Sequence, residues 1–277
     1  MLLAIALVAT GVTLANWLIQ SENQRRAARS LRARYSDVGI YYAESNLPSS
    51  IRTWLKTKLP EDYVDPVIRV RFGAQIDDIV ESRDVTNDDL RLTANFRSLR
   101  EFFLDEIHLE HLDADVFADF ERLEVLRLVD VHFDGNFGLA ISQLRNLRHL
   151  MISHYHLKNS DCLLDLRNLK RLEYFEIRCR ILTREIVEIF SQINSVTCLK
   201  LEADQLEPGG LAKFANHPNL TSLSIKLREP IHQNDLKSLA KLQSLKSLVL
   251  DCPLTDAEKT FLTNSLPGCN ITWQASF

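Results

Sequence analysis

Cysteine is scarce in this sequence, and the few residues that occur form no pattern that predicts chemistry. There are five cysteines, an odd number, and no CxxC pair occurs among them. A disulfide framework needs paired cysteines, so we interpret these thiols as small buried side chains, which favours a reducing compartment. An excess of one charge is also missing, because the 277 residues carry a net charge of only −4. This balance gives no signal of nucleic-acid binding.

Catalytic and cofactor motifs are missing as well. The sequence contains no GxSxG, P-loop, HExxH or GxGxxG, the local patterns of nucleophilic, phosphate, zinc and dinucleotide chemistry. His149, His154 and His156 do gather in one stretch. A metal site needs its ligands on one face, however, and we predict that His149 points from a strand while the other two lie in the following turn. We therefore expect no catalysis, no metal and no cofactor.

Charged side chains are absent from the first 19 residues. Residues 2–19 read LLAIALVATGVTLANWLI, which is just long enough to cross a bilayer, and Trp17 near the end suits the membrane interface. We predict an uncleaved transmembrane anchor over residues 1–19. The alternatives are a cleaved signal peptide, although the basic start of one is missing, and a core helix.

Arginine follows this apolar run at once. Residues 20–36 hold five arginines against one glutamate, a balance of +4, so residues 37–277 carry −8. The positive-inside rule then favours a cytoplasmic location for the rest of the chain, and the opposite orientation stays open. The stretch 22–35 is expected to be a solvated helical stalk, a segment attracted to anionic lipid headgroups at about 1 kcal/mol per charge, or both together.

Apolar residues recur with one spacing every 24 or 25 residues over more than half of the chain. With the first apolar residue of a unit as offset 0, the pattern is L-x-x-L-x-L at offsets 0, 3 and 5. A fixed period of about 20–29 residues with this motif is the signature of leucine-rich repeats. Seven units share the register: Leu99/Phe102/Leu104, Leu123/Leu126/Leu128, Leu147/Leu150/Ile152, Leu172/Phe175/Ile177, Val196/Leu199/Leu201, Leu220/Leu223/Ile225 and Leu245/Leu248/Leu250. Flanking triplets are Val67/Val70/Phe72 and Gly268/Ile271/Trp273.

This pattern predicts the fold class. Apolar residues alternate with polar ones around offsets 3 and 5, so each unit contributes a short strand with one buried face, and stacked units bury a shared core. We predict an α/β solenoid over residues 67–253, in which a curved parallel sheet is joined by helical returns. Favourable N-caps mark the expected starts of the helices: Thr86 or Asp88, Thr183, Asn234 and Thr255.

The two ends do not repeat, and we predict that they cap the stack, because a solenoid would otherwise expose its apolar edges. Residues 20–66 are expected to form a basic juxtamembrane helix and the N-terminal cap. Within this cap, Trp54 and Leu55 are expected to pack on the first repeat. Residues 254–277 are expected to form the C-terminal cap, a helix followed by a last strand.

Several motifs outside the repeats point to a family. They are the apolar N-terminus, the basic stretch QRRAARSLRARY, the stretch WLKTKLPEDYVDPVIRV before the repeats and the closing LPGCNITW. With them the chain resembles the membrane-anchored leucine-rich-repeat proteins of planctomycete-type bacteria. The resemblance implies an interaction module without catalytic residues. One departure concerns offset 8, where the usual asparagine or cysteine is replaced by Ile107, Val131, Tyr155, Arg180, Asp204, Arg228 and Pro253. The backbone groups of the turns therefore need other partners.

Side chains at offsets 2 and 4 are expected to point away from the core, in rows along the sheet. Phe103, Val125, Met151 and Tyr174 then form an apolar and aromatic patch, the kind of surface that marks interaction sites. The predicted partner-binding residues are Phe103, Val125, Arg127, His149, Met151, Tyr174, Glu176 and Lys200. The alternative is that this face is an ordinary solvated surface that includes a few apolar side chains and binds no partner.

The leading hypothesis is a membrane-anchored, non-catalytic protein–protein interaction module, either a scaffold or a receptor-like protein. It would bind a protein partner on the concave face of the sheet and the membrane through residues 2–19, and it would bind no nucleic acid. The alternative is a regulator or substrate adaptor that recruits or occludes an enzyme. An enzyme with dispersed catalytic residues is a third hypothesis.

Overall fold

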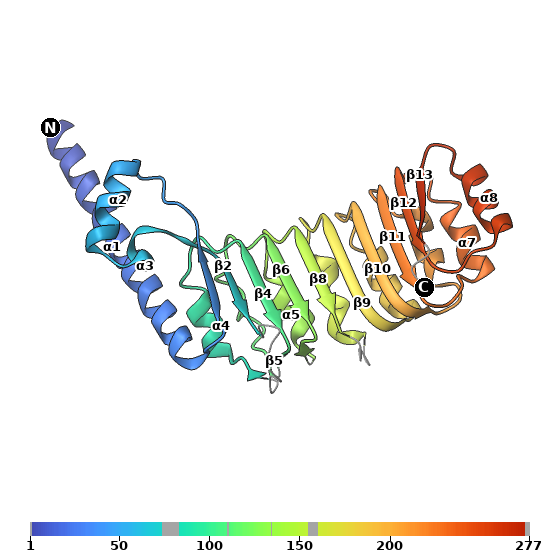
Figure 1. Cartoon of the computed structure of the whole chain (residues 1–277), viewed down its shortest axis with the longest axis horizontal. Coiled ribbons are helices and arrows are strands. Elements are labelled where there is room, and N and C mark those ends of the chain that lie inside the picture. Colours follow the sequence, from blue (N-terminus) through green and yellow to red (C-terminus); the bar gives the residue numbers. More distant parts are fainter. Residues whose placement is uncertain (1, 74–82, 110, 134, 155–159, 275–277) are drawn as a thin grey trace.

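A long sheet runs through the whole molecule, with helical segments along one side and a helical cap at each end (Figure 1). The computed structural model describes the backbone of residues 2–73, 83–109, 111–133, 135–154 and 160–274, and their side chains except at 2–11, 14, 62, 83 and 216. Ten strands follow one another in the main sheet: β1 (Gly39–Tyr42), β2 (Val67–Phe72), β4 (Glu101–Asp105), β6 (Val125–Val129), β8 (His149–Ser153), β9 (Tyr174–Leu182), β10 (Cys198–Leu206), β11 (Ser222–Leu227), β12 (Ser247–Asp251) and β13 (Asn270–Gln274).

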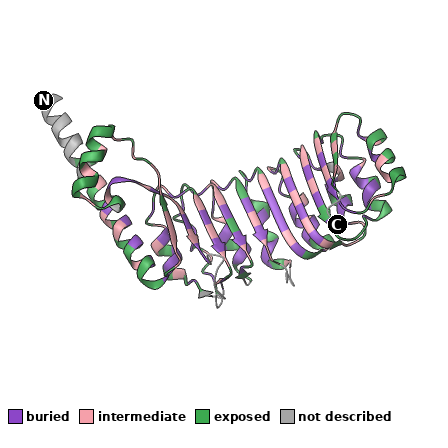
Figure 2. Ribbon diagram, in the orientation of Figure 1, coloured by how far each residue is buried: buried purple, intermediate pink, exposed green. Residues whose placement is uncertain are grey.

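The register of this sheet is the one that the repeat predicts. Every pair from β2 to β13 is parallel, and the residues at offset 3 lie side by side from strand to strand. The column reads Val70, Phe102, Leu126, Leu150, Phe175, Leu199, Leu223, Leu248 and Ile271. Most of these side chains are fully buried, and Figure 2 shows buried and partly exposed positions alternating along the strands. The predicted solenoid with its shared core is confirmed.

Helical returns cover the buried face of the sheet. Each return connects one strand to the next: α4 (Asn87–Thr93), α5 (Phe137–Ser142), the 3-10 helix η1 (Asp161–Asn168), α6 (Arg184–Ser191), the 3-10 helix η2 (Gly210–Asn216) and α7 (Gln233–Leu239). Thr86 begins α4 with a capping box, and Thr183 caps α6, as the sequence predicts. The start of α7 differs, because the imidazole of His232 rather than Asn234 is the N-cap.

The absent asparagine at offset 8 is replaced by two other sets of hydrogen bonds. In the turns after β4 and β6, Glu106 and Asp130 adopt left-handed backbone conformations and donate their N–H groups to the carbonyls of Val129 and Ser153, both at 2.8 Å. At the amino ends of the strands, side chains just before offset 0 reach the preceding repeat. These bonds are Asn146 to the Glu121 carbonyl, Ser195 to Leu169, Asn219 to Asn194 and Ser244 to Leu220, at 2.6–2.9 Å. Backbone hydrogen bonds between neighbouring repeats therefore serve the turns after β4 and β6.

A second, small sheet accompanies the first repeats. It consists of β3 (Arg83–Asp84), β5 (Ile107–Leu109) and β7 (His132–Phe133), paired in parallel in that order. In the fourth and fifth repeats the turn is part of the strand itself, because β9 and β10 continue for nine residues each.

The N-terminal cap is built differently from the expectation. Helix α1 (Leu2–Arg34) packs its second half against α4 and the end of the core, where Ala27, Ala28 and Leu31 are buried, and Tyr35, just after the helix, meets Phe72 edge to face at 5.1 Å. The solvated stalk is therefore wrong for this face of the helix, because small alanines let it approach the first repeat closely.

Helix α2 (Ser49–Lys58) does not pack on the first repeat. It has no buried residue among those described, and Trp54 is 60% exposed, so the prediction that Trp54 and Leu55 cover the repeat is wrong. The one-turn helix α3 (Glu61–Val64) follows it and lies against α1. The end of the stack that α2 was expected to cover is occupied by β1, which pairs with β2, and by α1, whose Ala27, Ala28 and Leu31 belong to the core.

The C-terminal cap is the predicted helix and strand. Helix α8 (Asp256–Ser265) begins at Thr255 with a capping box, and β13 closes the sheet. Among the described residues, no helix is long and apolar enough to span a membrane. Most side chains of the anchor predicted over residues 2–19 lie outside the described part of the chain.

Candidate partner-binding face

The face of the sheet opposite the helical returns carries two neighbouring rows of side chains, and we call it the open face. Its rows are formed by offsets 2 and 4 of each repeat. Phe103, Arg127, Met151, Glu176 and Lys200 lie side by side in one row. The second row runs Val125, His149, Tyr174. All eight residues singled out from the sequence thus lie on five adjacent strands of one face.

The centre of the open face is apolar and aromatic. His149 is exposed on β8, and its ring stacks on Tyr174 with centroids 5.6 Å apart and planes 20° from parallel. The guanidinium of Arg69 lies over the Phe103 ring, 5.3 Å from the ring centroid. This cation–π contact covers one side of the ring. Val125 and Met151 are half-buried between these groups. A molecule bound to this part of the face would meet mainly apolar and aromatic surface and few hydrogen-bonding groups.

Arg127 stands in the middle of that apolar centre. It is exposed, and within the part of the chain that the structure describes it has no ion-pair partner. The two arginines of β2 on the N-terminal side of Arg127 are engaged, since Arg69 pairs with Glu101 at 2.5 Å and Arg71 pairs with Asp105 at 2.6 Å. An unpaired guanidinium among apolar side chains is a suitable anchor for a carboxylate of a partner.

Glu176 behaves differently from its neighbours in the row. Its side chain is nearly buried and accepts hydrogen bonds from Tyr174 at 2.8 Å and from Arg178 at 2.8 Å, while Lys200 lies at 3.1 Å. Burial would raise the pKa of this carboxyl, but the bonds from Tyr174, Lys200 and Arg178 outweigh burial and hold the pKa below its usual value. Burial and the same carboxylate raise the pKa of the Tyr174 hydroxyl. Glu176 therefore stays ionised and fixes its neighbours.

The ion pairs continue beyond Glu176 towards the C-terminal repeats. Arg178 also pairs with Glu202 at 3.2 Å, and Lys226 pairs with Glu202 at 3.2 Å. These side chains, with Asp204 and Arg228, line a hollow of about 560 Å³ at the carboxyl ends of β8 to β11. Sequence reasoning missed this network, although the alternation of Arg178, Glu202 and Lys226 at offset 6 of successive repeats is visible in the sequence.

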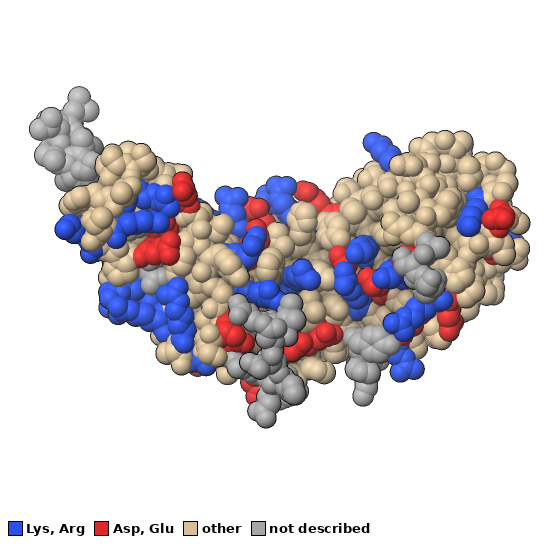
Figure 3. Space-filling model, viewed as in Figure 1, with Lys and Arg blue, Asp and Glu red and all other residues tan. Residues whose placement is uncertain are grey.

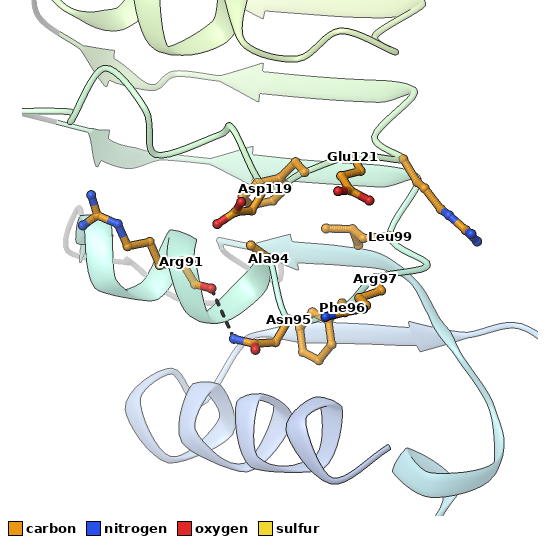
Figure 4. Close-up of a pocket in the computed structure, with 10 residues that line it drawn as sticks. Arg91, Ala94, Asn95, Phe96, Arg97, Leu99, Asp119 and Glu121 are labelled. Atoms are coloured by element: carbon orange, nitrogen blue, oxygen red, sulfur yellow. Dashed lines mark hydrogen bonds between the residues drawn. The ribbon is translucent and has the colours of Figure 1, made fainter. Parts of the chain in front are cut away.

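A second hollow lies on the other side of the molecule, between α4 and the next return (Figure 4). Arg91, Arg97, Asp119 and Glu121 are among the residues lining its volume of about 340 Å³. The side-chain amide of Asn95 donates to the Arg91 carbonyl at 3.3 Å, which stabilises the end of α4. No group of three His, Cys, Asp or Glu side chains in the described ranges could hold a metal ion, here or elsewhere.

The histidines that cluster in the sequence separate in the structure. His149 lies on the open face, whereas His154 belongs to the turn at the end of β8, and His156 falls outside the described residues. His154 instead packs against His132 with ring centroids 5.4 Å apart, and His132 packs against His108 at 4.7 Å. The 24-residue step from His108 to His132 is the signal that sequence reasoning missed.

Comparisons with known proteins found structural similarity to two leucine-rich-repeat-type structures without close sequence similarity. No protein-family model and no curated protein matches the chain. Among solved structures it is similar to an internalin from Listeria monocytogenes, with 15% identity and a TM-score of 0.41 over 68% of this chain and 62% of that one. It is also similar to the plant peptide hormone receptor RGFR1 in complex with RGF2, with 14% identity and a TM-score of 0.34 over 74% of this chain and 35% of that one. The chain spans less than two thirds of either protein.

Proposed function

We propose that this leucine-rich-repeat chain is a protein-binding module and that its open face is the binding surface. One observation carries the proposal: a half-buried apolar centre surrounds the exposed guanidinium of Arg127, which has no ion-pair partner among the described residues, while the cations around it are held in ion pairs. Interfaces combine an apolar centre with a polar rim, and arginine and aromatic side chains are enriched among the residues that dominate binding.

The same arrangement favours binding over catalysis. The acidic side chains that flank the apolar centre, Glu101, Asp105 and Glu176, accept hydrogen bonds or ion pairs from neighbouring cations. A general acid or base needs a free proton site near a reacting group, and these carboxylates are occupied. We therefore propose a non-catalytic scaffold or receptor-like protein. The alternative, a regulator or adaptor that recruits or occludes an enzyme, would use the same face.

We also propose that residues 2–19 tether the module to a membrane. Support comes from the sequence, because this run of 18 residues contains no charged side chain and is followed by five arginines within 20–36. The arginines favour a cytoplasmic location for the repeats.

The test compares the partners that co-purify with the full chain, solubilised in detergent, and with a variant carrying Phe103→Ala, Arg127→Ala and Met151→Ala. Tyr174 is left intact because its hydroxyl holds Glu176. We expect the variant to lose at least one stoichiometric partner. A matched control changes Ser222, Ser247 and Val249 to Ala, which lie in the same two rows near the other end of the sheet.

An unchanged set of partners for the first variant would overturn the proposal. If both variants lose the same partners, binding lies elsewhere or depends on general stability. A structural partner without enzymatic activity favours the scaffold, and a captured hydrolase or kinase favours the regulator.

A further inference from the structure

We propose that helix α2 lies on the lipid headgroups of a membrane and thereby fixes the orientation of the repeat array relative to the bilayer. This inference rests on the membrane tether proposed above and concerns a separate surface. The anchor would supply attachment, and α2 would supply a second contact that restricts rotation.

The first observation is where α2 begins. Trp17 and Gln20 of α1 line a hollow together with Leu47, which precedes α2 by two residues. Figure 1 draws α2 at the level of the part of α1 that projects beyond the sheet. In the sequence, this level of α1 is the point where the uncharged run 2–19 gives way to the arginines of 25–34. If that run crosses a bilayer, α2 lies at its surface.

The second observation is the exposed apolar character of this end. On α2, Ile51 is 48% and Trp54 is 60% exposed, and on α1 Leu18 and Ile19 are 46% and 59% exposed. Exposed aromatic and aliphatic side chains are costly in water, and Trp prefers the membrane–water interface. A helix with such residues and lysines beside them is typical of a segment that lies in the plane of the headgroups.

The third observation is charge. Residues 20–58 hold eight Lys and Arg against three Asp and Glu, a balance of +5, whereas the whole chain carries −4. Figure 3 shows Lys and Arg gathered over α1 and α2. Arg29 and Lys58 are exposed. Basic side chains close to a membrane surface are attracted to anionic lipids, so the occupant that complements this end of the molecule is an anionic bilayer.

The fourth observation is that α2 is held in place by ion pairs rather than by a buried face. The side chain of Asp65 is buried and accepts two bonds from Arg52, both 2.9 Å long, one from the Ser45 N–H at 3.1 Å, and pairs with Lys56 at 2.6 Å. Gln24 of α1 donates to the Asp65 carbonyl at 2.9 Å. These bonds leave Ile51 and Trp54 pointing outward in a fixed position, so contact with a surface would orient the solenoid.

The experiment uses the tryptophan of α2 as a probe in the full chain. The sequence has three tryptophans, Trp17, Trp54 and Trp273. Trp17→Phe with Trp273→Phe leaves Trp54 alone, and Trp17→Phe with Trp54→Phe leaves Trp273 at the far end of the array as the control. Each protein is reconstituted into vesicles of equimolar phosphatidylcholine and phosphatidylglycerol, with and without lipids brominated near the headgroup. Flotation after alkaline extraction reports the anchor independently.

We expect brominated lipid to remove most of the emission of Trp54 and to leave that of Trp273 unchanged. Flotation without quenching of Trp54 overturns the role of α2 and leaves the anchor standing. Quenching of Trp54 in a protein that no longer floats after alkaline extraction supports the surface contact of α2 and overturns the anchor. If Trp54 is not quenched and the protein does not float, both proposals are overturned. A companion variant, Ile51→Ser with Lys58→Gln, should weaken the quenching of Trp54, whereas Phe261→Ser, an exposed apolar residue of α8, should not. Equal quenching in the companion variant and in its parent counts against the proposed face of α2.

Discussion

The hydroxyl of Tyr174 donates a hydrogen bond of 2.8 Å to the carboxylate of Glu176, two residues further along β9. Residues two apart on a strand point to the same face, so the bond joins the aromatic centre of the open face to its network of ion pairs. Glu176 is only 6% exposed and receives Arg178 and Lys200 as well. The position of Tyr174, on which His149 stacks, therefore depends on one buried carboxylate.

Replacing Glu176 by Ala should destabilise the array. The substitution leaves the Tyr174 hydroxyl and the Lys200 ammonium without their acceptor on a partly buried surface. Hydrogen bonds to a charged group contribute about 2 kcal/mol each, and the loss is reduced here because the cations retain access to water. We expect the free energy of unfolding, measured with urea at pH 7, to fall by about 2 kcal/mol.

The lowered pKa of Glu176 also predicts how the loss of stability in Glu176→Ala changes with pH. Because the pKa of Glu176 is lowered in the folded chain, its contribution to stability is complete above the unfolded pKa of about 4.3 and is lost as the pH falls through the folded value. The difference between the parent and Glu176→Ala should therefore shrink below about pH 4. Glu173→Ala is the control, since Glu173 is exposed and pairs only with exposed Arg148, and it should cost below about 0.5 kcal/mol. Equal losses for both variants would contradict the role of Glu176.

Leu150 tests the register of the whole stack. Its side chain is fully buried between Leu126 and Phe175 of the neighbouring strands. Leu150→Asp places an unpaired carboxylate there, which should cost at least about 3 kcal/mol and unfold the middle of the array. Met151→Asp, one residue later, points to the open face and should leave a cooperative thermal transition near that of the parent. Similar transitions for both variants would mean that the assigned faces are wrong.

The sequence predicts the repeats well because their constraint is local and periodic. Because Leu126 and Leu128 lie on the same face of their strand, burying them decides which face of the strand points to the core. The 24-residue step repeats that requirement along the chain. The same alternation places Phe103, Arg127 and Met151 on the open face. What alternation cannot predict is how deeply such a side chain is covered. Glu176 is nearly buried because Tyr174 from its own strand and Lys200 from β10 converge on it.

The N-terminal cap was harder to predict because its contacts are distant in the sequence. Ala27 and Leu31 form a narrow apolar stripe in an arginine-rich helix, and composition alone favours a solvated stalk. Burial of that stripe depends on a core whose members lie about 40 residues away, among them Phe72, which meets Tyr35 just after the helix. The larger apolar side chains of α2 give a stronger local signal, yet Trp54 remains exposed because β1 and α1 already cover this end of the stack.

Asp235 connects two consecutive returns, and its removal should be costly. The carboxylate is fully buried and accepts the backbone N–H of Gly209 at 2.8 Å and that of Leu211 at 2.9 Å. Asp235→Ala leaves both donors buried without a partner, so we expect the free energy of unfolding to fall by about 3 kcal/mol. Asn234→Ala, which changes the exposed preceding residue of α7, should cost below about 0.5 kcal/mol in the same urea titration. A small loss for Asp235→Ala would mean that water replaces the carboxylate.

Asp65 should control the attachment of α2 without controlling the stability of the repeats. Burial opposes its ionisation, but hydrogen bonds from Arg52, Lys56 and the Ser45 N–H outweigh burial and hold the pKa of Asp65 well below its usual value. Asp65→Asn removes the charge that Arg52 and Lys56 share, and loss of one partner of a buried pair costs about 3 kcal/mol. Hydrogen exchange of the α2 amides should therefore accelerate by roughly a hundredfold, while the amides of β4 to β12 exchange as before.

The direction of the pKa shift extends this prediction to acid. A lowered folded pKa means that the stabilisation by Asp65 is complete above its unfolded pKa of about 3.9 and is lost only as the pH falls through the lower folded value. The α2 amides of the parent chain should therefore remain protected from hydrogen exchange at pH values where an ordinary aspartate is half protonated. Glu61→Gln is the matched control, because Glu61 contacts the same Lys56 at 3.5 Å from an exposed position. If Glu61→Gln releases α2 as fully as Asp65→Asn does, screening of Lys56 rather than the buried carboxylate holds the helix.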